Sequence, residues 1–141
     1  MEEAARIGEG ASSASRAAER GESLLPRFTQ TTASPTFRHG PFAGQSIGDV
    51  ATGLRAGQIS SSQLPVDVIT RDGNLLGLNT RSMLALRRAN ISPADWSMVD
   101  RTGQPAYEQL LDERLARNGL TNAGTDVLRI TGAGPGASWL G

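Results

Sequence analysis

Apolar residues recur with a regular spacing only after residue 36. Residues 1–36 join an Ala-, Glu- and Arg-rich opening to a Ser/Thr/Pro stretch with almost nothing to bury. This composition is typical of a flexible or helical N-terminal linker. Beyond it, aromatic and aliphatic residues are interleaved with turn-forming residues, and the end of the chain is rich in glycine. The pattern therefore predicts one packed domain over residues 37–132, followed by a Gly-rich C-terminal tail over residues 133–141.

The most distinct element in the pattern is a β-hairpin. Residues 65–71 alternate between apolar and polar and include several β-branched side chains, and apolar residues resume at 75–78. Between these segments lies Asp72-Gly73, a pair that is typical of a two-residue hairpin turn. The sequence therefore predicts two antiparallel strands joined by a tight turn.

Two shorter apolar segments, at 96–99 and 127–131, are expected to form further strands. In the second of them Arg129 and Thr131 fall on the same face, because side chains alternate along a strand. Both side chains could project into a groove, although a threonine in a strand is also common for its strand propensity alone.

The spacing of apolar residues also predicts three helices. The first follows Ser46, a suitable N-cap, and the second runs from Thr80 to a left-handed end at Asn90. The third begins at Pro105 and ends before Gly119. Together with the strands, this order predicts an α+β fold in which N-terminal helices are followed by a small, mainly antiparallel four-stranded sheet.

Composition narrows the chemistry that the domain can perform. The chain has no cysteine and a single histidine, so a disulfide framework, a thiolate metal site, a cysteine nucleophile and a His-rich metal cluster are all excluded. We therefore expect no metal and no cofactor. No apolar run approaches the length of a membrane-spanning helix, so no membrane-spanning segment is expected either.

Charge is balanced overall but unevenly distributed along the chain. The 14 arginines equal the acidic residues in number, and there is no lysine. Between Asp72 and Asp95 there is no acid, whereas Arg81, Arg87 and Arg88 all fall there. Since Arg81 and Arg88 are seven positions apart, a helix places them within about 20° of each other. This stretch is therefore a local positive island in a neutral chain.

The start of the second helix coincides with this positive island. Asn79 or Thr80 could cap the helix, and the free N–H groups of a helix start favour anions. Together with Arg81, the strand-to-helix junction is a candidate cradle for a phosphodiester. An ordinary capped helix with a solvated polar face would have the same sequence, so both interpretations stay open at this point.

A second acid-free stretch, from Ser23 to Gly48, contains Arg27, Arg38 and His39. Histidine is the side chain that changes charge nearest to neutral pH, so His39 is the natural candidate for general acid or base catalysis. A loop histidine that is hydrogen-bonded to the backbone is an equally ordinary interpretation.

Several segments between Gly40 and Thr131 resemble a known group of proteins when taken together. They are PFAGQSI at 41–47, LPVDVITRDGN at 64–74, LNTRS at 78–82 and NGL at 118–120. This succession resembles the C-terminal toxin modules of bacterial polymorphic toxins, which are carried by contact-dependent inhibition, filamentous-haemagglutinin-like and Rhs-type proteins.

The resemblance implies a toxin domain that is secreted as part of a larger toxin and acts in the cytoplasm of a neighbouring cell. It also implies neutralisation by a cognate immunity protein, in a heterodimer with one copy of the toxin. Many such modules are similar to the barnase/EndoU/colicin/RelE group of ribonucleases, which have an α+β architecture and cleave RNA without a metal ion. The implied substrate is therefore RNA, and the implied cofactor requirement is none.

For such a ribonuclease, the resemblance suggests specific roles for residues of this chain. Arg81 and Arg129 would stabilise the phosphate, His39 would transfer a proton, and Thr131 would help to position the reacting group. The residues expected to bind substrate are Asn79, Thr80, Ser82, Arg71, Arg87 and Arg88.

Two other functions are alternatives, and the sequence fits the first of them better than the second. A non-catalytic interaction or delivery module of a polymorphic toxin would fit the neutral net charge and the lack of a recognisable catalytic triad. A metal-dependent deoxyribonuclease needs clustered histidines and carboxylates, which the sequence does not show.

Overall fold

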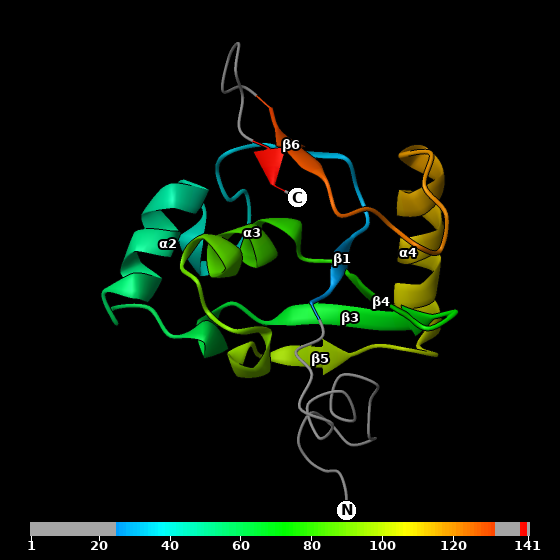
Figure 1. The fold of residues 1–141 in the computed structure, drawn as a ribbon, viewed down its shortest axis with the longest axis horizontal. Helices are drawn as coiled ribbons and strands as arrows, with labels where there is room; N and C mark the ends of the chain where they lie inside the picture. The colour runs from blue at the N-terminus through cyan, green and yellow to red at the C-terminus, as the bar shows by residue number, and fades with distance from the viewer. Residues whose placement is uncertain (1–24, 132–138, 141) are drawn as a thin grey trace, which may run out of the picture.

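A mixed four-stranded sheet forms the centre of the fold (Figure 1). The computed structural model describes residues 25–131 and 139–140. The strands lie in the order β1-β4-β3-β5, and their bounds are Arg27–Phe28, Asn74–Gly77, Val66–Arg71 and Met98–Asp100. Only β3 and β4 pair antiparallel, because β1 lies parallel to β4 and β5 lies parallel to β3. The α+β class is confirmed, but the sheet is mixed and not mainly antiparallel.

The predicted hairpin is confirmed and corresponds to β3 and β4. Its turn residues Asp72 and Gly73 have φ values of 51° and 81°. A turn with positive φ at both central positions matches the right-handed twist of the flanking strands. In the resulting register, Ile69 lies opposite Leu76.

The last predicted strand belongs to a different sheet from the one expected. It is β6 (Leu128–Ile130), which lies parallel to β2 (Thr32–Ala33) and antiparallel to β7 (Trp139–Leu140). The fourth strand of the four-stranded sheet is β1 and not β6. The reason is that Ala33 and Ile130 are partners in the second sheet, and both side chains are buried there.

All three predicted helices are present. They are α2 (Ile47–Arg55), α3 (Thr80–Arg88) and α4 (Pro105–Arg117). Ser46 caps α2 by accepting a hydrogen bond from Asp49 N at 2.9 Å, and Asn90 follows α3 with a φ of 60°. Three short 3₁₀ helices complete the described part, namely η1 (Gly40–Phe42), η2 (Ser61–Gln63) and η3 (Pro93–Asp95). No helix in these described ranges is long and apolar enough to cross a membrane.

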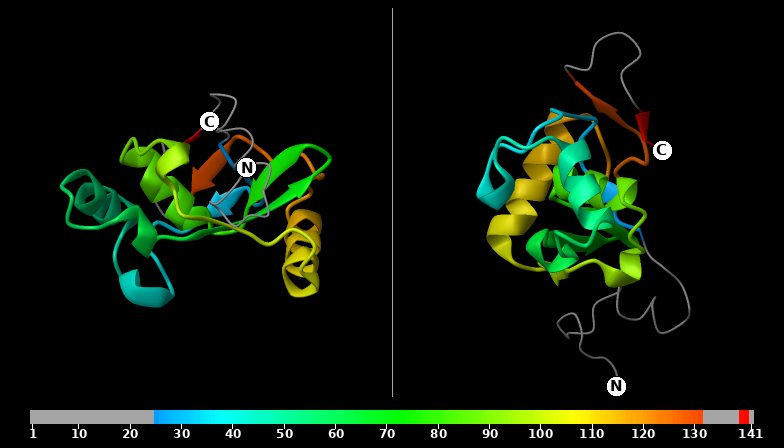
Figure 2. Two further views of the ribbon diagram at one scale, coloured as in Figure 1. Left: turned by 90° about the horizontal axis from the view of Figure 1, so that it is seen from below. Right: turned by 90° about the vertical axis from the view of Figure 1, so that its left-hand side faces the viewer.

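Helices cover both faces of the four-stranded sheet (Figures 1 and 2). Along β3, Val66 and Val68 pack with α2 and α3, whereas Ile69 packs with Leu111 of α4. This division follows from the alternation of side chains along a strand. The sheet is therefore the middle layer between two hydrophobic cores.

Residues 25–36 belong to the packed domain, which corrects the expectation of a linker over 1–36 for this segment. Phe28 and Thr29 are 0% exposed, and Ala33 is also buried. Strands of two residues are too short to leave a periodic pattern in the sequence, so β1 and β2 could not be predicted from the spacing of apolar residues.

Because β1 and β2 precede α2, the expected order of helices followed by a sheet is not confirmed. Residues 1–24 and most of the predicted tail lie outside the described residues.

An ion-pair cluster at the end of β3 attaches α4 to the sheet. Arg71 donates to Glu108 Oε1 at 2.7 Å and to Asp112 Oδ1 at 2.7 Å. Glu108 Oε2 also accepts a hydrogen bond from Gly103 N at 2.7 Å. The Gly103 N–H, and after it the Arg71 guanidinium, hold the pKa of Glu108 below its ordinary value. The folded state therefore favours the charged carboxylate.

Replacing Glu108 by glutamine tests this attachment. The pKa of Glu108 lies below its ordinary value of 4.5 in the folded state. Its contribution to stability is therefore complete above about pH 4.5 and is lost as the pH falls through the lower folded-state value. We expect Glu108→Gln to lower the free energy of unfolding by about 1 kcal/mol at neutral pH. Urea unfolding over a series of pH values should show the difference from the wild type closing on acidification.

Glu113→Gln is the matched control, because it removes the same charge from the same helix. Within the described ranges, the Glu113 carboxylate has a hydrogen bond only with Gln109, at 3.3 Å. We expect little change in stability at any pH. A deficit of Glu108→Gln that stays constant on acidification would contradict the assigned role of Glu108.

Candidate anion-binding site

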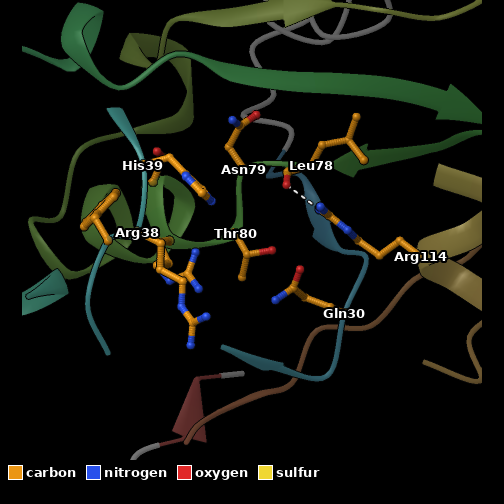
Figure 3. Close-up of a pocket in the computed structure, with 10 residues that line it drawn as sticks. Gln30, Arg38, His39, Leu78, Asn79, Thr80 and Arg114 are labelled. Atoms are coloured by element: carbon orange, nitrogen blue, oxygen red, sulfur yellow. Dashed lines mark hydrogen bonds between the residues drawn. The ribbon is translucent and has the colours of Figure 1, made fainter. Parts of the chain in front are cut away.

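A cavity of about 220 Å³ lies where β4 runs into α3. Four segments that are distant in sequence contribute to it: the β1–β2 connection, the loop after β2, the start of α3, and α4 (Figure 3). The lining residues are Gln30, Phe37, Arg38, His39, Leu78, Asn79, Thr80, Arg81, Ser82 and Arg114.

The structure brings five of the predicted site residues together in this cavity: His39, Asn79, Thr80, Arg81 and Ser82. Four of them are consecutive in the sequence, so any fold would place these four close together. His39 is forty positions away from this group in the sequence, and the fold places it at the same cavity. The predicted strand-to-helix cradle and the predicted proton-transfer residue therefore share one site.

The cavity is cationic. Its lining includes Arg38, Arg81, Arg114 and His39, whereas the described residues that line it include no carboxylate. Burial, and then the nearby charge of Arg38, lowers the pKa of Arg81. Burial, and then the charges of Arg117 and Arg81, lowers the pKa of Arg114. Arginine remains charged despite such shifts, so these cations repel one another, and a bound anion would relieve the repulsion.

Thr80 carries a buried hydroxyl group at the centre of the site. The residue is 5% exposed, and its Oγ1 has no hydrogen-bond partner in the described part of the chain. Figure 3 shows Thr80 between the side that carries Gln30 and Arg114 and the side that carries Arg38 and His39. An unsatisfied buried hydroxyl costs about 1–3 kcal/mol, and a ligand with an accepting oxygen would recover part of this cost.

The backbone at the start of α3 is also free to bind an anion. Asn79 does not cap the helix as predicted, because its Oδ1 instead accepts a hydrogen bond from Asp67 N at 2.7 Å. Among the described residues, no acceptor is bonded to the N–H groups of Thr80, Arg81 or Ser82. Helix N-termini with free N–H groups attract phosphate and carboxylate.

The arginine side chains are held by neutral oxygen atoms. Arg81 Nη2 donates to Ser34 Oγ at 2.8 Å, and Arg38 Nε donates to the same oxygen at 3.4 Å. Arg114 Nη1 donates to the carbonyl oxygen of Leu78, as the dashed line in Figure 3 marks. None of these contacts cancels the positive charge of the cavity.

Three arginines that the sequence assigned to substrate binding have other contacts. Arg71 is engaged by Glu108 and Asp112, as described above. The Arg87 guanidinium lies over the ring of Phe28, 5.2 Å from its centroid, and the Arg88 guanidinium lies beside Gly48 in α2. These three residues do not line the cavity. Arg71 lies at the hairpin end of β3, and the last turn of α3 places Arg87 against β1 and Arg88 against α2.

Arg129 and Thr131 also lie outside the set of residues that line the cavity. Arg129 is an exposed residue of β6, and Thr131 directly follows β6, where its Oγ1 donates to Ala33 O at 3.3 Å. Their expected place beside Arg81 assumed that the last strand joins the four-stranded sheet. Because β6 pairs with β2 instead, the structure does not bring them into the site.

Sequence reasoning missed Gln30, Arg114 and the role of Arg38 in this site. Arg114 lies on an acid-rich helix, where nothing in the sequence distinguishes it from a solvated surface arginine. Gln30 lies in the segment that was expected to be a linker. The acid-free stretch around Arg38 was the one signal that pointed to its location.

The described residues include no group of three or more His, Asp or Glu side chains that could hold a metal ion. Comparison with protein-family models, curated proteins and solved structures finds no match to this chain. The fold and the site together define an α+β domain with a cationic cavity at a helix N-terminus, and the described residues that line this cavity include no carboxylate.

Substituting valine for Thr80 tests whether the unsatisfied hydroxyl serves a ligand. Valine keeps the shape and removes the hydroxyl, so we expect the Tm of Thr80→Val without added anion to equal or exceed that of the wild type. For the wild type, inorganic phosphate at ten times its Kd should add about 1.4 kcal/mol of stability. Thermal unfolding with and without phosphate should show at most half of this gain in Thr80→Val.

Thr29→Val is the matched control, because Thr29 is buried and its hydroxyl donates to Gly77 O at 2.9 Å. Removing this satisfied hydroxyl should cost about 1–2 kcal/mol and leave the gain from phosphate unchanged. A full phosphate effect in Thr80→Val would show that the Thr80 hydroxyl does not contact the anion.

Proposed function

We propose that this chain is a toxin domain that cleaves RNA with groups supplied by the protein itself. The observation that carries the proposal is the clustering of Arg38, Arg81 and Arg114 at one cavity, which His39 and Thr80 also line. This set combines several donors for a phosphate with one group that can accept a proton near neutral pH.

RNA contains the nucleophile for its own cleavage. In the proposed reaction, the 2′-oxygen attacks the adjacent phosphorus while His39 takes the proton from the 2′-hydroxyl. The bond from the 2′-oxygen to phosphorus forms, and the bond from phosphorus to the 5′-oxygen breaks. Solvent donates a proton to the departing 5′-oxygen, and His39 returns its proton to solvent. The products are a 2′,3′-cyclic phosphate and a free 5′-hydroxyl.

The arginines act on the charge that develops at phosphorus. The phosphorane carries more negative charge than the starting diester, so donors fixed around it bind the transition state more tightly than the substrate. Arg81 comes from the start of α3 and Arg114 from α4, so the substrate is held from two sides. The Thr80 hydroxyl and the free N–H groups at the start of α3 add neutral donors. Ser82 and Asn79 lie beside them and contribute to positioning.

The resemblance to polymorphic-toxin modules supports the cellular part of the proposal. On this basis the domain is secreted within a larger toxin, acts in the cytoplasm of a neighbouring cell and forms a heterodimer with its immunity protein. An acidic immunity protein that covers the cavity would complement its charge and exclude RNA.

A second candidate function is a non-catalytic module that binds RNA or another polyanion at the same cavity. One observation favours it: among the described lining residues, His39 is the single imidazole available for general acid–base catalysis, and it is exposed. Such a module would need the arginines and would not need the imidazole.

Incubation of the purified protein with total tRNA in EDTA separates the two functions. We expect the wild type to yield discrete fragments that end in a cyclic phosphate. Arg81→Ala should slow cleavage by about 100-fold, because one fixed donor to the transition state is lost. His39→Ala should slow it by a similar factor of about 100, because the proton acceptor is lost.

Arg55→Ala is the charge-matched control, since Arg55 is an exposed residue of α2 that does not line the cavity. We expect cleavage within about twofold of the wild type. Tight tRNA binding without cleavage would support the non-catalytic module. Full activity of Arg81→Ala would rule out the proposed site.

A further inference from the structure

The Ser34 side-chain oxygen contacts two of the cavity arginines, and the Ser34 carbonyl oxygen also accepts a hydrogen bond from Arg81 Nε at 3.3 Å. Its Oγ accepts hydrogen bonds from Arg81 Nη2 at 2.8 Å, from Arg81 Nε at 3.2 Å and from Arg38 Nε at 3.4 Å. The Ser34 hydroxyl donates its own hydrogen to Thr36 O at 3.3 Å. A hydroxyl has one hydrogen and two lone pairs, so this arrangement turns the lone pairs toward the two guanidinium groups.

We infer that Ser34 is a positioning residue, a neutral bridge that holds Arg81 and Arg38 side by side so that both can contact one phosphate. The inference rests on the proposed function, because it concerns the same cavity. Ser34 does not line the cavity itself, so it acts through the two arginines.

The two arginines need such a bridge, because they come from different elements and repel each other. Arg81 belongs to α3, whereas Arg38 belongs to the exposed loop that follows β2. Ser34 directly follows Ala33, which is fixed in the second sheet opposite Ile130. The acceptor oxygen is therefore anchored by regular structure, and it draws a loop arginine toward a helix arginine.

The neutrality of the bridge distinguishes these arginines from others in the protein. Arg71 is bound by Glu108 and Asp112, and Arg101 is bound by Asp67 at 2.9 Å. In those clusters the carboxylates neutralise the guanidinium and leave no charge for a ligand. A hydroxyl fixes the geometry of Arg81 and Arg38 while their charge remains available to an anion.

Three substitutions at position 34 test the inference, with inorganic phosphate as the probe in calorimetric titration. Ser34→Asp should raise the Tm and weaken phosphate binding by more than about 100-fold, because the carboxylate would pair with both arginines. Ser34→Ala should weaken phosphate binding by about tenfold, because the arginines lose their shared acceptor. Ser34→Thr keeps the hydroxyl and should bind within about threefold of the wild type.

RNA cleavage provides a second readout that a purely structural role would not change. We expect Ser34→Ala to lower kcat more than it raises KM, since misaligned arginines affect the transition state most. Ser62→Asp, which adds the same charge at an exposed position in η2, should leave both constants unchanged.

The outcomes separate this inference from the proposed function. If the wild type binds no phosphate and cleaves no RNA, both are overturned. If the wild type binds phosphate and Ser34→Asp binds it within about threefold of the same affinity, the bridging role alone is overturned. Phosphate binding that is weakened in Ser34→Ala, weakened further in Ser34→Asp and kept in Ser34→Thr supports it.

Discussion

The hydrogen bonds between Asp67 and the β4–α3 junction determine the form of the site. Leu78 N donates to Asp67 O at 2.9 Å, and Asp67 N donates to Asn79 Oδ1 at 2.7 Å. This exchange uses the backbone of β3 to fix the point at which α3 begins. It also removes the Asn79 side chain from the capping position, so the first N–H groups of α3 have no acceptor from their own junction. The same residues that end the hairpin therefore produce a helix N-terminus open to an anion, with Thr80 buried at its first position.

Two groups among the described arginines help to explain how a chain of zero net charge has a positive site. The first group fastens elements together through carboxylates, as Arg71 does with Glu108 and Asp112 and Arg101 does with Asp67. The second group lines the cavity and is held by a hydroxyl or a carbonyl oxygen. A carboxylate that pairs with an arginine of the first group does not neutralise an arginine of the cavity. The net charge of the chain therefore does not predict the charge of this site. The acceptor that holds each guanidinium decides whether the positive charge is neutralised.

Sequence reasoning succeeded where the determinants are local. The Asp72-Gly73 turn and the Ser46 cap depend on neighbours within a few positions, and both are confirmed. It failed where the determinants are tertiary. Strands of two residues, such as β1 and β2, are defined by their partners and leave no periodic signal in the sequence. The position of Ser34, which directly follows β2, could therefore not be predicted. The assignment of Arg129 failed for the same reason, because β2 competes for β6 and removes it from the four-stranded sheet.

The features that make the site suitable for an anion are also features that lower the stability of the empty protein. An unsatisfied hydroxyl at Thr80 and repulsion between Arg81 and its neighbours each reduce a net stability that is typically only about 5–15 kcal/mol. The two cores on either face of the sheet offset this cost, and the cavity lies at the edge of both. An anion that satisfied the hydroxyl and screened the arginines would recover part of this free energy. The cost of the empty site therefore contributes to the affinity of the occupied site, and stability measured against anion concentration reports that affinity.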